Sequence, residues 1–424
     1  MNYHEVRSIN RIASALFKLA VFAMIPVSAQ GATYYVAKTG SDATTCTQAR
    51  VQQTPKLTVT GGVSCMVGGD TLIILNGIYT EGAISRIPGG SAGAPTIIKA
   101  QNRNQAILRP SSGFAVFWLE ASYITIDGVD ADCVNVTSGS CGPYLHNNAY
   151  APTNITLQHG TARNAKGIYG SGIELGHGGH HLIWDMDVIN NGTDKQFDHG
   201  IYVYGSNVTI DGNRIRGSAG WGIHVYHGCD GKNGCPSTGI VIRNNTVYSN
   251  SNRSALLITQ AAGTLIYNNI LYSNGADGVE LYGSGVSGTQ IYNNTIYGNG
   301  RYCVHIPDAG SSTTSIRNNI CYRNASDSIL DQGSSTTKSS NLMANASFTN
   351  APSGDFHIEP GSPAIAGGEN LSTVFTADFE GRARPVASAW DVGALVFSAT
   401  ASAPPPPTNP PTAPVNLRLA GSTN

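Results

Sequence analysis

The chain has few charged residues, and this scarcity narrows its range of partners. Asp, Glu, Lys and Arg together make up 12% of the 424 residues, and the formal net charge is -1. Such a chain has no broad field that would draw it to a nucleic acid or to an anionic membrane surface. We therefore expect no nucleic-acid partner and no membrane partner, and any grip on an acidic polymer must come from a few placed cations.

Long apolar runs and helical periodicity are missing as well. After the first thirty residues no segment approaches the roughly 18 uninterrupted apolar residues of a membrane-spanning helix. The chain instead contains 50 glycines, many asparagines, and almost no Ala, Leu, Glu and Lys at helical spacing. This composition is typical of an all-β chain with many tight turns.

Residues 1–29 have the pattern of a secretory signal peptide. Arg7, Arg11 and Lys18 make a positive leader, the apolar stretch 19–27 is too short to span a bilayer, and small residues follow. Removing the leader also removes Glu5, which brings the formal net charge to about -3. We predict a secreted, extracellular protein.

The eight cysteines form pairs that are neighbours in the sequence, which fits an oxidising destination. No pair has the C-x-x-C spacing of a zinc site. Structural disulfides are therefore expected, although the fourth pair could equally be two buried thiols. The pairs are Cys46 with Cys65, Cys133 with Cys141, Cys229 with Cys235, and Cys303 with Cys321.

A repeat with a period of 24 or 25 residues dominates the second half of the chain. Asn-Asn pairs occur at 244–245, 268–269, 293–294 and 318–319, each followed after one residue by an apolar position and a tyrosine. A coil of this length can hold three short strands, and stacked coils would place the asparagines in a hydrogen-bonded ladder. The repeat predicts a parallel β-helix, a solenoid of about ten coils.

A second repeated motif marks another strand of each coil. Alternation along a strand sends the second and fourth positions of the motif inward and the third outward. The motif reads G-I-E-L at 172–175, G-I-Y-V at 200–203, G-I-H-V at 222–225, A-L-L-I at 255–258, G-V-E-L at 278–281 and C-V-H-I at 303–306.

The chain resembles bacterial right-handed parallel β-helix proteins, a family that includes pectate lyases, alginate lyases and mannuronan C5-epimerases. The resemblance lies in the opening segments Y-Y-V-A-K-T-G-S-D and G-G-D-T-L-I-I-L-N-G-I-Y-T-E, in the asparagine repeats, and in the closing segments D-F-H-I-E-P-G-S-P-A-I-A-G-G, D-F-E-G-R-A-R-P and W-D-V-G-A-L. It implies a right-handed helix and a polysaccharide substrate. It specifies architecture more than chemistry, because the fold carries lyases, epimerases, hydrolases and adhesins alike.

We predict one folded domain and two further segments. The β-helix domain should span 30–398, with an N-terminal cap region at 30–80 and a C-terminal cap region at 350–398. Residues 399–412 are a proline-rich, extended linker. Residues 413–424 look like the start of a truncated fibronectin type III-like module, and the protein is expected to be a monomer.

The outward positions of the second motif form a strip that suits a sugar polymer. Tyrosine faces stack on pyranose rings while the hydroxyl can hydrogen-bond, although tyrosine and histidine are also ordinary residues of an exposed β surface. The expected substrate-binding residues of the strip and its border are Glu174, Tyr204, Trp221, Tyr226, Asp277, Glu280, Tyr282, Arg301 and His305.

The chemistry that fits this strip best is β-elimination in a uronic-acid polymer, or the related C5-epimerisation. It needs a cation for the carboxylate, a base for the C5 proton and an acid for the leaving oxygen. Lys195 and Arg253 are candidates for the cation, His199 or His224 for the base, and Tyr202 for the acid. Asp198 would orient a histidine. The run Q-F-D-H-G at 196–200 is similar to the D-P-H element of mannuronan C5-epimerases, without its proline.

Two other functions remain open. A glycoside hydrolase would use a carboxylate pair, and Glu174, Asp198, Asp277 and Glu280 supply carboxylates near the strip. A β-helix could also bind or adhere to a polysaccharide without cleaving it.

Calcium is a candidate cofactor. Asp127, Asp130 and Asp132 cluster in D-G-V-D-A-D, and oxygen-rich turns suit this ion. The resemblance points the same way, because similar lyases use calcium to bridge the uronate. The alternative is an ordinary Asp-Gly turn between strands.

Overall fold

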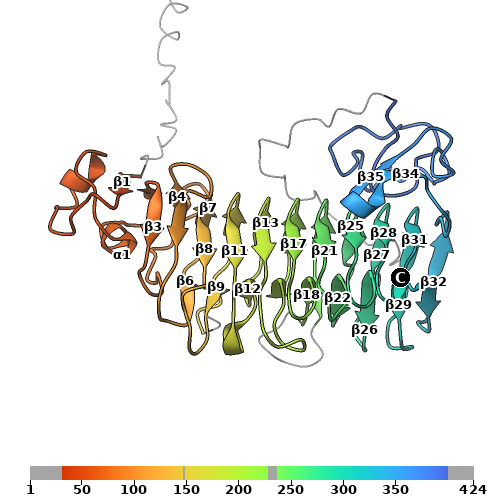
Figure 1. Ribbon diagram of the computed structural model, residues 1–424, viewed down its shortest axis with the longest axis horizontal. Helices are drawn as coiled ribbons and strands as arrows, with labels where there is room; N and C mark the ends of the chain where they lie inside the picture. Colours follow the sequence, from red (N-terminus) through yellow and green to blue (C-terminus); the bar gives the residue numbers. More distant parts are fainter. Residues whose placement is uncertain (1–30, 147–148, 228–235, 400–424) are drawn as a thin grey trace, which may run out of the picture.

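The computed structural model describes residues 31–146, 149–227 and 236–399. Three parallel sheets run along the long axis of the molecule, and the central coils each contribute one strand to each sheet (Figure 1). Sheet B, with ten strands, confirms the predicted all-β solenoid of about ten coils. The described part contains no helix long and apolar enough to cross a membrane.

The three sheets are named here by their strands. Sheet A contains β1 (Thr33–Val36), β2 (Thr71–Ile74), β4 (Thr96–Ala100), β7 (Ile124–Asp127), β10 (Ile155–Gln158), β13 (Leu182–Trp184), β16 (Thr209–Asp211), β20 (Val241–Arg243), β24 (Leu265–Tyr267), β27 (Gln290–Tyr292), β30 (Ser315–Arg317) and β33 (Thr337–Ser339). Sheet B contains β3 (Gly77–Tyr79), β5 (Ala106–Leu108), β8 (Asp130–Asp132), β11 (Thr161–Arg163), β14 (Asp187–Ile189), β17 (Arg214–Arg216), β21 (Thr246–Tyr248), β25 (Ile270–Tyr272), β28 (Thr295–Tyr297) and β31 (Ile320–Tyr322). Sheet C contains β6 (Ala115–Leu119), β9 (Gly142–His146), β12 (Ile173–Gly176), β15 (Ile201–Tyr204), β18 (Ile223–Val225), β22 (Leu256–Thr259), β26 (Val279–Tyr282), β29 (Tyr302–Ile306) and β32 (Ser326–Asp331).

The remaining elements are short. They are α1 (Val59–Val63), the 3-10 turns η1 (Gln48–Arg50), η2 (Gly167–Tyr169) and η3 (Ala351–Ser353), and the strands β19 (Ser237–Thr238), β23 (Ala261–Ala262), β34 (Phe348–Asn350) and β35 (Asp355–Ile358). At the N-terminal end α1 and η1 lie against β1, and the Cys46–Cys65 disulfide ties this region together.

Sheet C folds as its motif predicts. The second and fourth positions of each copy point inward and are fully buried, as Ile201 and Val203 show in β15. Burying an aliphatic side chain of this size stabilises the fold by about 1.5–3 kcal/mol. The third positions stay in register from coil to coil, so that Tyr202 pairs with Glu174 on one side and His224 on the other.

The Asn-Asn pairs serve two purposes. The first asparagine of each pair has a positive φ, 52° at Asn268, and asparagine tolerates this left-handed backbone better than most residues do. The second asparagine is fully buried, and its side-chain amide donates to the side-chain oxygen of the next coil's asparagine at 2.9–3.0 Å. The predicted ladder is confirmed; it runs through Asn213, Asn245, Asn269, Asn294, Asn319 and Asn341.

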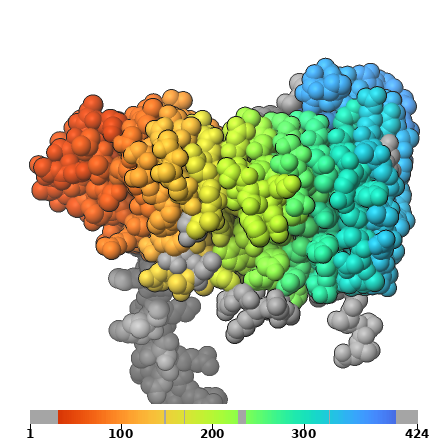
Figure 2. Space-filling view, turned by 60° about the horizontal axis from the view of Figure 1, so that its bottom comes forward, coloured from red at the N-terminus to blue at the C-terminus, as the bar shows by residue number. Residues whose placement is uncertain are grey.

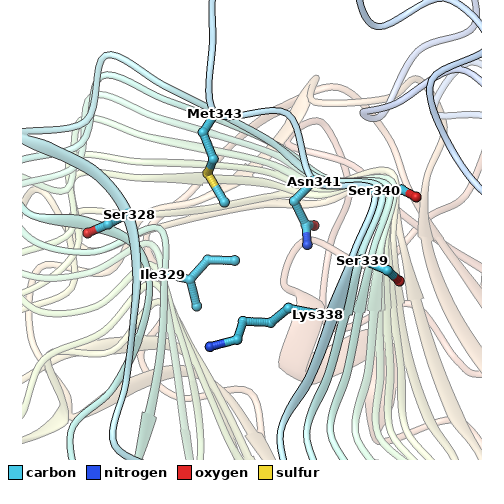
Figure 3. Close-up of a pocket in the computed structure, with 7 residues that line it drawn as sticks. All are labelled: Ser328, Ile329, Lys338, Ser339, Ser340, Asn341 and Met343. Atoms are coloured by element: carbon cyan, nitrogen blue, oxygen red, sulfur yellow. The ribbon is translucent and has the colours of Figure 1, made fainter.

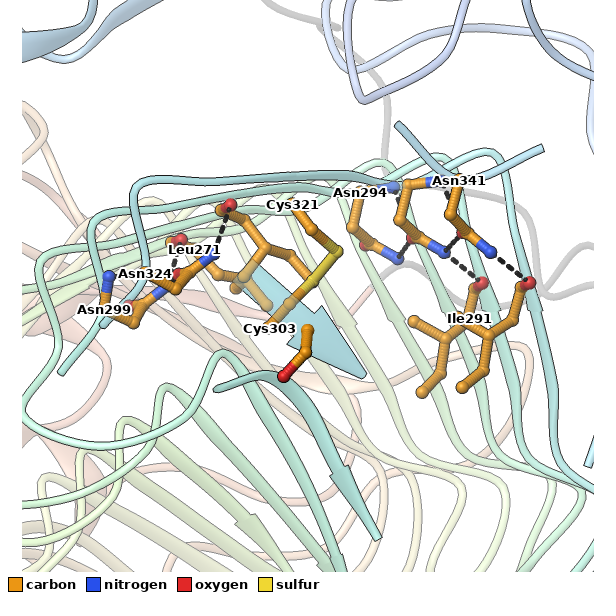
Figure 4. Close-up of a disulfide and its surroundings, with 12 residues drawn as sticks. Leu271, Ile291, Asn294, Asn299, Cys303, Cys321, Asn324 and Asn341 are labelled. Carbon is orange, nitrogen blue, oxygen red and sulfur yellow. Dashed lines mark hydrogen bonds between the residues drawn. A yellow bond between two sulfur atoms is a disulfide. The ribbon is translucent and has the colours of Figure 1, made fainter. Parts of the chain in front are cut away.

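A second asparagine ladder follows sheet B. It joins Asn250, Asn274, Asn299 and Asn324 at 2.9 Å per step. The fourth cysteine pair, for which two buried thiols were the alternative, forms a disulfide between Cys303 and Cys321. This disulfide lies between the two ladders in the last coils (Figure 4). Cys133–Cys141 is also bonded, whereas Cys229 and Cys235 lie outside the described residues.

The segment predicted as a C-terminal cap lies along the flank of the solenoid, where β34 and β35 sit beside β25 and β28 (Figure 1). Phe375 stacks on Tyr267, with ring centroids 4.4 Å apart, and packs against the buried Trp390. The buried Arg384 donates to the side-chain oxygen of Asn268 at 3.0 Å. The first asparagines of the repeat therefore hold the returning chain.

At the C-terminal end of the solenoid, β33 and β32 are the last strands of sheets A and C. Figure 3 shows a hollow between them into which Ile329 and Lys338 project. Lys338 forms an ion pair with Asp331 at 2.8 Å. The predicted signal peptide, proline-rich linker and fibronectin-like start lie almost wholly outside the described residues.

Candidate active site

The predicted strip forms on the outer face of sheet C, which lies at the bottom of Figure 1 and is turned toward the reader in Figure 2. The register gives one unbroken column from β12 to β29. Its members are Glu174, Tyr202, His224, Leu257, Glu280 and His305. Two groups of side chains gather along this column.

The first group, called the histidine centre, contains His199, Tyr202, Trp221, His224 and Arg253. Nε2 of His199 lies 3.1 Å from Nδ1 of His224. The ring of Tyr202 lies 5.0 Å from that of His224 and 5.3 Å from that of His199. Strand register puts Tyr202 beside His224, whereas His199 comes from the loop that enters β15. Four of the six predicted catalytic residues therefore meet here.

Arg253 covers the histidine centre from the loop that precedes β22. Its guanidinium lies 4.7 Å from the ring centroid of Trp221, and its Nε donates to the carbonyl oxygen of Lys195 at 3.0 Å. No carboxylate of the described residues forms an ion pair with Arg253. A guanidinium held by a ring and a carbonyl keeps its charge and its two NH2 groups for a ligand.

Lys195 and Asp198 both belong to the loop that enters β15, but the structure gives them different places. Lys195 is exposed. The buried carboxylate of Asp198 accepts hydrogen bonds from the backbone N–H groups of Thr193 and Asp194, both at 2.7 Å. Asp198 thus shapes its own loop, which differs from the expected role of orienting a histidine.

Glu174 and Tyr204 form a pair at the start of the strip. The Tyr204 hydroxyl donates to Oε1 of Glu174 at 2.8 Å. A Cβ atom at Gly176 would lie 2.0 Å from the Tyr204 ring, so only glycine lets the ring lie there. Burial raises the pKa of the Glu174 carboxyl, and the hydrogen bond from Tyr204 lowers it in part.

The second group, called the acidic centre, contains Ser254, Asp277, Glu280, Arg301 and His305. Asp277 is fully buried, and its Oδ2 lies 3.1 Å from both Arg301 and Nδ1 of His305. Ser254 donates to Oε2 of Glu280 at 2.8 Å. Since Asp277 is inaccessible, it positions Arg301 and His305 rather than touching a ligand.

Trp221 joins the two centres. Its indole N–H donates to Oε2 of Glu280 at 3.1 Å. This hydrogen bond spans the intervening coil, which contains Leu257. Of the other predicted binding residues, Tyr226 is half-buried and packs 5.8 Å from the ring of His224. Tyr282 is 56% exposed, which suits a stacking surface for a sugar.

The residues proposed for calcium do not come together. Asp127 lies on sheet A and contacts His159 at 2.7 Å. Asp130 and Asp132 lie on sheet B, where Arg163 contacts both and Arg109 contacts Asp132. Arginines balance the charges of Asp130 and Asp132, and Asp127 lies on another sheet beside His159, so these residues do not fit a resident calcium ion.

Another group of potential metal ligands lies in the acidic centre. The donor atoms of Asp277, Glu280 and His305 lie within 4.8 Å of one another. Arg301 already places its positive charge on Asp277 and lies 2.6 Å from Nδ1 of His305. This arrangement does not suit a hard cation either, because calcium prefers an all-oxygen shell.

Two polar residues of the site carry no sequence signal. Thr259 lies 3.2 Å from Nε2 of His224, and Ser254 links Asp277 with Glu280. Both are small hydroxyl residues next to an apolar strand, a pattern found throughout the chain. Their importance comes only from the neighbours that other coils supply.

The buried histidines are neutral at ordinary pH. Burial, together with the nearby charge of Arg253, lowers the pKa of His199 to about 3. Burial also holds the pKa of His224 well below its usual value, and His199 adds to this effect. Both rings are therefore uncharged at neutral pH.

These pKa values predict loss of stability in acid. Below about pH 6.5 the unfolded chain protonates both histidines while the folded chain does not, so each costs about 1.4 kcal/mol of unfolding free energy per pH unit. Urea unfolding between about pH 7 and pH 5 should show a steeper decline for the natural chain than for His199→Gln/His224→Gln. The exposed His180→Gln change should leave the slope unaltered, and parallel curves for all three proteins would contradict the prediction.

Comparisons with known proteins agree with this architecture. The family described as "right handed beta helix region" matches residues 103–262 and 234–366. A pectate lyase structure is 16% identical, with a TM-score of 0.63, covering 86% of this chain and 96% of its own. A rhamnogalacturonan lyase is 15% identical, with a TM-score of 0.44, covering 75% and 91%. The A-module of a mannuronan C-5 epimerase from Azotobacter vinelandii is 13% identical, with a TM-score of 0.43, covering 64% and 91%.

No curated protein sequence matches the chain. At these identities the pectate lyase likeness establishes the fold and not the reaction. The family match spans more than half of the 424 residues, and the three parallel sheets have the arrangement that the family requires. The chain therefore belongs to the family of right-handed β-helix proteins, as its sequence resemblance predicts.

Proposed function

We propose that the protein is a secreted enzyme that binds a uronic-acid polysaccharide along sheet C and cleaves it by β-elimination at the histidine centre. The observation that carries the proposal is the position of Arg253 above the neutral pair His199 and His224. Among the described residues this arginine has no carboxylate partner. The pectate lyase with the same fold acts, by its name, on pectate.

Each part of the elimination has a candidate residue. The uronate carboxylate would pair with Arg253, which makes the C5 proton more acidic. The histidine pair would take that proton, a C4–C5 double bond would form, and the C4–O4 bond would break. Burial raises the pKa of Tyr202, so its hydroxyl keeps a proton that it can give to the leaving oxygen.

The carboxylates are poorly placed for hydrolysis. An inverting hydrolase needs two accessible carboxyl groups roughly 6.5–9.5 Å apart. Glu174 and Glu280 are four coils apart in the column, roughly 19 Å at about 4.8 Å per coil. Asp198 and Asp277 are buried by their own partners, which leaves no suitable pair among these four.

Arg253 and Arg301, which lie in the loops before β22 and β29, differ in a way that tests the proposal. Arg301 forms an ion pair with Asp277, whereas Arg253 has no carboxylate partner in the part of the chain that the structure describes. Binding of a substrate carboxylate should therefore depend on Arg253. The full-length protein would be incubated with polygalacturonate, alginate, glucuronan and a neutral glucan, and absorbance near 235 nm would be recorded together with new reducing ends.

We expect new absorbance on at least one polyuronate and none on the neutral glucan. Arg253→Gln should lower kcat/KM by about 10²-fold or more, because an uncompensated charge contact to the reacting group is lost. Arg301→Gln should have a much smaller effect on kcat. Reducing ends without absorbance would support a hydrolase, and retention on a polymer column without either product would support a binding protein.

A further inference from the structure

The histidine pair ends at a third residue, Thr259. The hydroxyl of Thr259 lies 3.0 Å from the carbonyl oxygen of Val225 and 3.2 Å from Nε2 of His224. A hydroxyl has one hydrogen, and a carbonyl oxygen can only accept. The Thr259 hydrogen therefore points to Val225, and Thr259 accepts a hydrogen bond from His224.

This direction sets the protons on both rings. His224 carries its hydrogen on Nε2 and, being neutral, has a bare Nδ1. That atom must then accept from Nε2–H of His199, 3.1 Å away. His199 in turn has a bare Nδ1, which is buried and has no hydrogen-bond partner among the residues that the structure describes.

The opposite direction of the two hydrogen bonds, from Thr259 to Nε2 of His224 and from Nδ1 of His224 to Nε2 of His199, is less stable. It would place a hydrogen on Nδ1 of His199, where no acceptor is available, and a buried N–H without an acceptor costs about 1–3 kcal/mol. It would also take the Thr259 hydrogen away from Val225. Both directions leave Nδ1 of His199 without a partner among the described residues, so the difference between them is the hydrogen bond from Thr259 to Val225, which the opposite direction loses.

We infer that Thr259 fixes the tautomers of His224 and His199 and leaves Nδ1 of His199 as the ring nitrogen of the pair whose lone pair is not engaged in a hydrogen bond with the described residues. The role of that nitrogen as the base rests on the proposed function, whereas the tautomers do not. Thr259 is thus a positioning residue that acts through two rings.

Gly220 explains why the bare nitrogen can exist. A Cβ atom at Gly220 would lie 2.9 Å from Nδ1 of His199, so glycine leaves the side of the ring free of a side chain. This nitrogen is buried beside the backbone of Gly220, so a substrate can touch it only if that backbone moves. Burial is the main reason for the low pKa of His199, and binding of a carboxylate to Arg253 would relieve the smaller contribution of the arginine's charge.

The experiment is 15N NMR of the full chain labelled at histidine, with His199→Gln and His224→Gln used for assignment. The natural chain should show Nε2–H on both residues, with Nδ1 of His199 having the shift of a bare nitrogen without a hydrogen bond. Thr259→Val should move or average the proton of His224 onto Nδ1, and Thr259→Ser should restore the natural spectrum. The control is Thr289→Val, because Thr289 is also buried and its hydroxyl has no hydrogen-bond partner among the described residues.

The outcomes separate the inference from the proposed function. An Nδ1–H signal on either histidine of the natural chain, or an unchanged spectrum in Thr259→Val, would overturn the inference whatever the activity is. Thr259→Val should also lower kcat by about 10–100-fold with little change in KM, with rescue by Thr259→Ser. If Thr259→Val does not fold, Thr259→Ala provides the same test. If the natural chain shows the predicted tautomers but has no lyase activity, the assignment of His199 as the base is wrong and the tautomer assignment stands.

Discussion

Turnover should fall about 10²–10⁴-fold when His199 or His224 is replaced by alanine, because each change removes the neutral pair that accepts the C5 proton. The measurement is kcat and KM on the polyuronate that gives the strongest absorbance signal. Circular dichroism would check that the variants still fold, since both rings lie within the wall of the solenoid.

Tyr282→Ala is the matched comparison. Tyr282 is exposed on the same strip, so its loss should raise KM and leave kcat nearly unchanged. The elimination mechanism is wrong if both histidine variants keep full activity while Glu174→Gln or Glu280→Gln abolishes it. That result would favour a carboxylate hydrolase.

Replacing Asn269 by alanine should lower the free energy of unfolding by several kcal/mol. Its amide donates to Asn294 and to backbone oxygens of Ile242 and Tyr267, and its oxygen accepts from Asn245. Each buried group left without a partner costs about 1–3 kcal/mol. Urea unfolding followed by circular dichroism gives the difference.

The exposed Asn252 provides the control, because its single described side-chain hydrogen bond, to Ala219, lies at the surface. Asn252→Ala should cost less than about 1 kcal/mol. Equal losses at Asn252 and Asn269 would mean that the ladder is not a main source of coil-to-coil stability.

The sequence predicts the fold well because the relevant information is local and repeated. Alternation and a fixed period are enough to place Ile201 and Val203 inside, and to align Tyr202 with Glu174 and His224. The second ladder has the same period as the first, and Asn274 lies five residues after Asn269. It could have been found by the same reasoning.

Side-chain direction at the site is harder to predict. Register brings Tyr202 and His224 together, but it does not say that Trp221 reaches Glu280 or that Asp198 faces its own loop. These directions depend on packing between coils that are distant in sequence. The role of Thr259 needs even more detail, because it depends on the position of one hydrogen.

The path of the returning C-terminal segment also determines how the molecule would respond to a mechanical load. The described chain ends just after Phe397, which packs beside Ile320 and Val392. A pulling force applied at Phe397 would be transmitted through Arg384 and Trp390 to the coils that contain Asn268 and Tyr292. The segment would have to be sheared off before the final coil could unwind, so the open end of the solenoid is shielded from force transmitted along its own chain.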